Sequence, residues 1–99
     1  MLKNITVSFD KILWGWWAKD GNHQEAFEDL LDTIIINKED LDITPWTTTM
    51  KVTHDLRAKQ EQLDIIDQCR EDTPLEDYLN GCLRWLRAEE EKMKATFDG

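Results

Sequence analysis

Residues 22–37, NHQEAFEDLLDTIIIN, carry the clearest helical signal in this 99-residue chain. The first four residues form a capping box, in which the Asn22 side chain accepts from an early amide while Glu25 reaches back. Apolar residues then recur at helical spacing along one face: Ala26, Phe27, Leu30, Leu31, Ile34 and Ile35. Most of the acids of this segment fall on the opposite face. The pattern predicts a helix that begins at Asn22 and fades near Asn37.

A second capping box, Thr73-Pro74-Leu75-Glu76, marks the start of the last helix. A long apolar stripe follows it: Leu75, Leu79, Cys82, Leu86, Met93 and Phe97. We expect the Thr73 cap to stabilise the helix by about 1 kcal/mol. The two helices predict a shared core, made of Phe27, Leu30, Leu31, Ile34, Leu79, Cys82 and Leu86.

Two further segments are compatible with either helix or strand. The apolar residues from Ile5 to Trp17 fit one helical face, but Ile5, Val7 and Phe9 also alternate as in a strand. A helix from about Ser8 to Lys19 is favoured, and a short strand paired with residues 47–53 is the alternative. Residues 50–72 are predicted to be helical, with an unclear start because residues 46–53 are rich in β-branched side chains.

These segments predict an all-α fold of three or four helices packed as a small antiparallel bundle. A short N-terminal strand or hairpin is the alternative. Residues 1–99 are few enough to form a single helical domain with one modest core.

The charge distribution bears on partners more than on chemistry. Residues 20–42 hold eight acids against one base, residues 61–77 hold seven against one, and the whole chain carries −9. This excess disfavours direct binding of nucleic acid and favours a protein with a basic surface, or a cation. No apolar run approaches the roughly 20 residues of a membrane span. The N-terminus has no signal-peptide pattern and the two cysteines form no CxxC pair, so we expect a cytoplasmic protein without a cofactor.

The predicted function is that of a small acidic module that binds, and inhibits or regulates, a protein with a basic surface. Mimicry of a nucleic acid is a more specific version, since phage- and plasmid-encoded inhibitors often have this size and charge. The candidate partner-binding acids are Glu25, Glu28, Asp29 and Asp32 on one helix and Asp64, Asp67 and Glu71 on another. Trp14 has two interpretations: it packs on the side of the core, or it is an exposed contact for a partner or a homodimer.

An enzyme is the main alternative. Glu25-x-x-Glu28 and Glu61-x-x-Asp64 place acids three apart on two helices, where they share a face. This layout resembles the ExxE…ExxD pattern of the all-α nucleotide pyrophosphohydrolases of the MazG type. The resemblance covers these positions only, and it implies Mg²⁺ held by the four carboxylates. A solvated acidic face is the other interpretation, and a structural assembly adaptor is the third functional class. His23 and His54 are predicted to lie at the surface.

Overall fold

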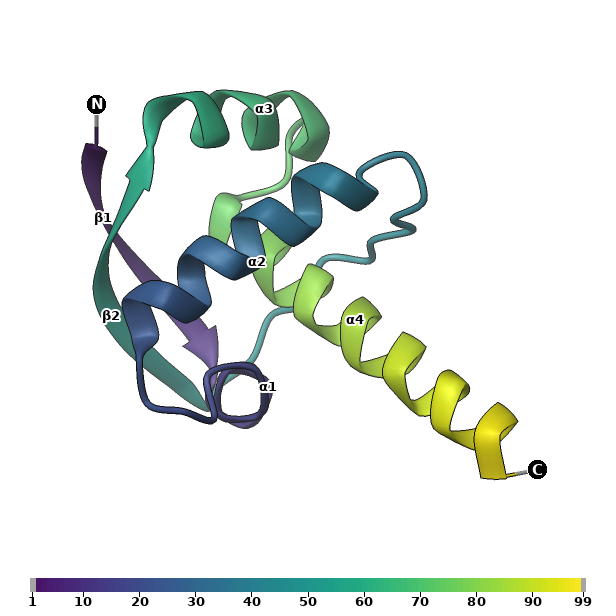
Figure 1. Ribbon diagram of the computed structural model, residues 1–99. Coiled ribbons are helices and arrows are strands. Elements are labelled where there is room, and N and C mark those ends of the chain that lie inside the picture. The colour runs from purple at the N-terminus through teal and green to yellow at the C-terminus, as the bar shows by residue number, and fades with distance from the viewer. Residues whose placement is uncertain (1, 99) are drawn as a thin grey trace.

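The computed structural model describes residues 2–98, with side chains for residues 2–94. The fold is mixed α/β, 57% helical and 19% strand (Figure 1). The elements are β1 (Leu2–Asp10), α1 (Lys11–Trp17), α2 (His23–Asn37), β2 (Lys51–Lys59), α3 (Gln60–Arg70) and α4 (Leu75–Asp98). The predicted all-α bundle is therefore wrong, and so is the predicted helix over residues 50–59. The alternative of an N-terminal strand comes closer to the structure.

The two strands form one antiparallel ribbon, from Leu2 opposite Lys59 to Asp10 opposite Lys51. Successive side chains of a strand point to opposite faces. The inner face of the ribbon carries Ile5, Val7 and Phe9 of β1 and Val52, His54, Leu56 and Ala58 of β2. The outer face is polar, and there the Thr6 hydroxyl donates to Asp55 at 2.7 Å. The ribbon therefore buries one face only.

The error in the predicted helices has a simple geometric cause. Ile5 and Phe9 in β1, like Val52 and Leu56 in β2, are four residues apart. A spacing of four returns to the same side both in a strand of period 2 and nearly so in a helix of period 3.6. Only the partner strand decides between them, and β1 and β2 are separated in sequence by α1 and α2.

The helices cover the inner face of the ribbon, with α2 and α3 against β2, and α1 and α4 against β1 (Figure 1). The predicted core is confirmed for Phe27, Leu30, Leu31, Ile34, Leu79 and Cys82, which are buried together, while Leu86 is half-buried. Met93 is 70% exposed, because the end of α4 extends away from the body. Phe97 lies outside the described side chains. Among the described residues, no helix is both long and apolar enough to cross a bilayer.

The two predicted helix starts have different outcomes. The Asn22 side chain accepts from the Glu25 amide at 3.1 Å and its own amide donates to the Glu25 carboxylate at 3.1 Å, which confirms the first cap. The last helix begins at Leu75, close to the expected position. Among the described residues, however, the Thr73 side chain makes no hydrogen bond to this helix. The stabilisation that the sequence predicts from Thr73 therefore has no structural basis.

Asp10 turns the chain from β1 into α1. One carboxylate oxygen accepts from the amides of Ile12 and Leu13, both at 3.0 Å, and so caps the helix. The other oxygen accepts from the indole N–H of Trp46 at 3.1 Å. The guanidinium of Arg84 lies 4.0 Å from the centre of the Trp46 ring. A single buried carboxylate thus joins β1, α1, the loop before β2 and, through Trp46, α4.

Candidate functional site

A tight link places the end of α1 beside the start of α2. The Gly21 N–H donates to the Ala18 carbonyl at 3.0 Å, and Gly21 has φ of 79°, a conformation that glycine adopts without strain. Asn22 then caps α2 directly. Because the link is short, the side chains at the end of α1 lie against the first turns of α2.

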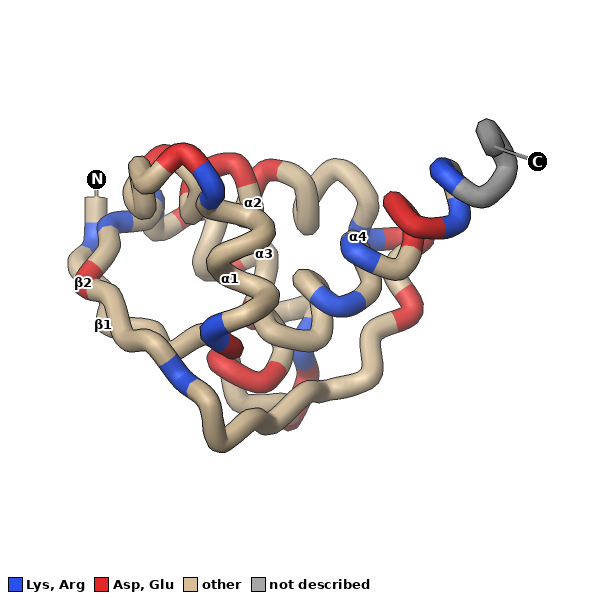
Figure 2. The backbone as a smooth tube through the Cα atoms, turned by 90° about the horizontal axis from the view of Figure 1, so that it is seen from below, with Lys and Arg blue, Asp and Glu red and all other residues tan. Residues whose placement is uncertain are grey.

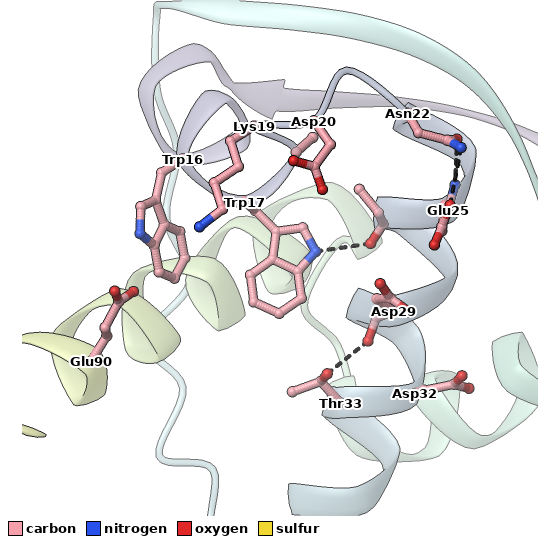
Figure 3. A pocket seen from close by; sticks show the side chains of 12 residues that line it. Trp16, Trp17, Lys19, Asp20, Asn22, Glu25, Asp29, Asp32, Thr33 and Glu90 are labelled. Carbon is pink, nitrogen blue, oxygen red and sulfur yellow. Dashed lines mark hydrogen bonds between the residues drawn. The ribbon is translucent and has the colours of Figure 1, made fainter.

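A groove of about 510 Å³ lies along this junction and extends to α4 (Figure 3). Its lining combines two indoles, several carboxylates and one ammonium group. The lining residues are Trp16, Trp17, Ala18, Lys19, Asp20, Asn22, Glu25, Ala26, Asp29, Asp32, Thr33 and Glu90. Three helices and a turn therefore contribute to one concave surface.

The two tryptophans form the apolar wall of the groove. The Trp17 indole N–H donates to the Ala26 carbonyl at 2.8 Å, which fixes this ring against α2. The Trp16 ring lies 5.7 Å from the Trp17 ring, centre to centre, at a tilt of 52°. Both side chains are half-buried. The wall is therefore preorganised and still presents aromatic surface.

The polar wall is strongly acidic. Of the described residues, five contribute carboxylates to the groove, Asp20, Glu25, Asp29, Asp32 and Glu90, against one base, Lys19. Some of these acids already have partners, since Glu90 pairs with Lys94 at 3.3 Å and Asp32 accepts from Gln62 at 2.8 Å. Within the described residues, the carboxylates of Asp20 and Asp29 have no hydrogen bond or ion pair. The groove therefore carries uncompensated negative charge beside aromatic rings.

The predicted partner-binding acids divide into two groups. Glu25, Asp29 and Asp32 line the groove, because their i, i+4, i+7 spacing keeps them on one stripe of α2. Glu28 is exposed but lies beside that stripe. The acids on and after α3, which are Asp64, Asp67 and Glu71, lie outside the groove. Asp67 forms an ion pair with Arg70 at 2.8 Å. The structure thus brings together less than half of the predicted acidic face.

Trp14 is part of the core, in agreement with the first of its two interpretations. Its side chain is 2% exposed and stacks on Phe9 with ring centres 4.0 Å apart and nearly parallel planes. A residue this deeply buried presents no surface to a partner. The contact role predicted for Trp14 is therefore corrected, and Trp16 and Trp17 present the accessible aromatic surface instead.

The alternative metal site is not assembled. Glu25 and Glu28 lie on α2, and Glu61 and Asp64 lie on α3, but among the described residues no three acidic, histidine or cysteine side chains group as metal ligands. Asp64 accepts from Gln60 of its own helix at 2.9 Å. The resemblance to the MazG-type hydrolases also required an all-α fold, which this chain does not have.

The two histidines meet in a ring stack at the edge of the core. His23 and His54 have ring centres 4.0 Å apart at 26°. His23 Nδ1 accepts from the Trp14 indole N–H at 3.0 Å. The Nε2 atom of His54 is buried and has no hydrogen-bond partner among the described residues. The prediction that both histidines are surface groups holds only in part, since both are half-buried where β2 and the start of α2 pack against each other.

This arrangement predicts acid sensitivity. Burial lowers the pKa of His54 below its ordinary value, and the nearby charge of His23 lowers it further. The unfolded chain therefore takes up the proton first, so stability is full above pH of about 6.5 and falls as the pH drops through the folded-state pKa. Urea unfolding between pH 7.5 and 5 should show this loss. His54→Phe should flatten the profile in that window, and an unchanged profile would contradict the assignment.

No protein-family model, curated protein or solved structure matches the chain. The case for the groove as a functional site therefore comes from its geometry.

Sequence reasoning missed Trp16, Trp17, Asp20 and Glu90 as residues that line the groove. One signal was present: adjacent helical residues point about 100° apart, so Trp16 and Trp17 could not both face the core. The approach of Glu90 from α4 left no sequence signal.

Proposed function

We propose that the protein is a small acidic interaction module whose groove binds a basic segment of a partner protein. The observation that carries this proposal is the convergence of five carboxylates and two half-buried indoles on one groove with a single lysine. Arginine and lysine side chains suit such a surface, because they form charge-assisted hydrogen bonds to carboxylates and are attracted to indole faces.

The rigidity of the groove fits a binding role. A binding module needs a preorganised surface, which the fixed Trp17 ring and the capped start of α2 supply. The net charge of −9 favours fast encounter with a basic surface at low salt. Nucleic-acid-handling proteins are a natural class of partner, since they carry basic grooves. In that version the acids of α2 occupy the place of phosphates.

The proposal predicts that groove charges, and not total charge, control binding. The probe is a hexa-arginine peptide, measured by titration calorimetry at low and physiological salt. Replacing Asp20 and Asp29 with lysine should weaken binding by about tenfold or more, a loss of about 1.4 kcal/mol. Binding by the parent protein should weaken as salt rises, because exposed charges are screened beyond about 8 Å near physiological ionic strength.

A matched control separates the groove from the wider acidic surface. Glu28→Lys with Asp64→Lys changes the net charge by the same amount, but both residues are exposed and lie outside the groove. This pair should change peptide affinity by less than about threefold, as expected of a change in long-range field only. Equal losses of peptide affinity in the two double variants would show that binding depends on net charge alone. The groove would then no longer be the proposed site.

A homodimer, also predicted from the sequence, stays a prediction. Between residues 2 and 94, the exposed large apolar side chains are spread over several parts of the fold: Leu2, Ile12, Ile36, Met50 and Met93. Scattered exposed apolar residues are normal on monomers. Sedimentation at high micromolar concentration distinguishes the two states directly.

A further inference from the structure

Backbone directions in the ribbon can be assigned from two side-chain contacts. In an antiparallel pair, opposite residues alternate between those bonded to each other and those whose N–H and C=O point outward. The Gln24 side chain of α2 bonds both the N–H and the C=O of Arg57, each at 2.8 Å. The N–H and C=O of Arg57 therefore point away from β1. Those of the opposite residue, Asn4, point away from β2.

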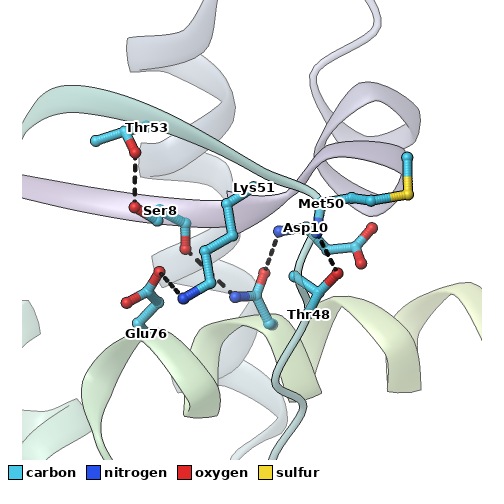
Figure 4. Close-up of polar contacts among 8 residues, drawn as sticks. Ser8, Asp10, Thr48, Met50, Lys51, Thr53 and Glu76 are labelled. Atoms are coloured by element: carbon cyan, nitrogen blue, oxygen red, sulfur yellow. Dashed lines mark hydrogen bonds and ion pairs between the residues drawn. The ribbon is translucent and has the colours of Figure 1, made fainter.

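The second contact fixes the same alternation from the other end of β1. The Asn80 side chain of α4, which is 1% exposed, accepts from the Asp10 N–H at 2.9 Å and donates to the Ser8 C=O at 3.3 Å (Figure 4). Ser8 and Asp10 therefore also point outward. The even-numbered residues of β1 thus all point their N–H and C=O groups away from β2, toward the free edge of β1.

Among the side chains that the structure describes, those of the helices cover this edge only at its end. The Asn80 amide occupies the position of a neighbouring strand at Ser8 and Asp10. Within the described residues, the outward N–H and C=O groups of Asn4 and Thr6 have no partner, and both residues are exposed. An edge of unpaired backbone groups is a template for a further strand.

The charge around this open edge is opposite to that of the protein. Residues 2–6 and the residues paired with them, 55–59, carry Lys3, Arg57 and Lys59 against Asp55 alone. Asp55 is already engaged by the Thr6 hydroxyl. In Figure 2 the basic residues gather at the end of the ribbon that holds the N-terminus. A second copy of the chain would bring like charges together here, whereas an acidic strand would not.

We infer that residues 2–6 of β1 form a second binding site, which takes an extended acidic segment of a partner protein as a third strand. Main-chain hydrogen bonds to Asn4 and Thr6 supply the pairing, and Lys3, Arg57 and Lys59 select for acidic side chains. This site shares no residue with the acidic groove. It would remain even if the groove bound nothing.

Amide hydrogen exchange of ¹⁵N-labelled protein tests the inference residue by residue. The probe is the peptide acetyl-Asp-Val-Asp-Val-Asp-Val-amide at millimolar concentration. Exchange at Asn4 and Thr6 should slow by about tenfold when peptide is added, whereas Val7, whose N–H points into the ribbon, should change little. The same peptide N-methylated at every residue should give no protection, because neither of its edges has donors for the added ladder.

Two proline variants provide the matched comparison. Asn4→Pro removes an outward donor of β1, and Thr53→Pro removes an outward donor of β2, so neither breaks the ladder between the strands. The first should weaken peptide binding at least tenfold and the second should not. Lys3→Glu with Lys59→Glu should weaken it similarly without touching the backbone.

Three results would overturn the inference. One is the absence of slowed exchange at Asn4 and Thr6 with the acidic peptide. Another is equal protection by acetyl-Lys-Val-Lys-Val-Lys-Val-amide. The third is protection that appears without peptide as protein concentration rises, which would assign the edge to a second copy.

Discussion

Replacing Asp10 with alanine is expected to lower the free energy of unfolding by about 3 kcal/mol, from loss of a helix cap and of a hydrogen bond to a buried charged group. The carboxylate accepts from the amides of Ile12 and Leu13 and from the Trp46 indole, and the residue is 7% exposed. Its removal leaves these donors without an acceptor in the interior. Urea unfolding of the variant measures the loss, and a cost below about 1 kcal/mol would contradict this assignment.

Asp10→Asn is the informative control. Asparagine caps helices as well as aspartate does, but its amide group would face the Trp46 N–H, donor against donor. The cost should therefore shrink when Trp46 is also changed to phenylalanine. A double-mutant cycle that gives purely additive costs would show that Asp10 and Trp46 act independently.

The same carboxylate predicts behaviour in acid. Burial alone raises the pKa of Asp10, but hydrogen bonds from Leu13, Trp46, Thr48 and Ile12 outweigh it and hold this pKa below its ordinary value. The contribution of Asp10 is therefore present above pH of about 4 and is lost as the pH falls through the lowered pKa. The alanine variant should lose less of its remaining stability in that window than the parent does.

Gly81→Ala is expected to destabilise the protein by about 2 kcal/mol, although alanine is the better helix former by about 1 kcal/mol. A Cβ at this position would lie 2.6 Å from the Thr44 carbonyl oxygen and 2.8 Å from Ile43 Cγ2. Glycine lets the loop before β2 cross α4 at close range. The added methyl group would force the backbone of that loop to move. Thermal unfolding measures the effect.

Gly15→Ala is the matched control in another helix. A Cβ at Gly15 meets nothing within 4 Å, so the substitution should stabilise the protein by about 0.5–1 kcal/mol. The two substitutions are chemically identical and should have opposite signs. If Gly81→Ala were neutral or stabilising, the loop could not pack on α4 as closely as described.

Part of the groove could be predicted from the sequence. The acids Glu25, Asp29 and Asp32 were found because they share one stripe of a helix that local signals define. Trp16 and Trp17 belong to the apolar residues that fit one helical face, and such a stripe does not show where the core ends. Glu90 belongs to the groove only because α4 passes α1, and no local pattern records that approach.

The sequence by itself determined the elements that local interactions define. The helix at residues 23–37 follows from its cap and its unbroken 3.6-residue stripe, and the last helix follows from its stripe. The net charge and its concentration in two stretches are likewise properties of the sequence. Only the tertiary structure decided that residues 2–10 and 51–59 are strands. Their apolar residues fit both periods, and each strand gains its ladder hydrogen bonds from a partner strand about 50 residues away. The same long-range pairing buries Trp14, stacks His23 on His54 and leaves one edge of β1 open.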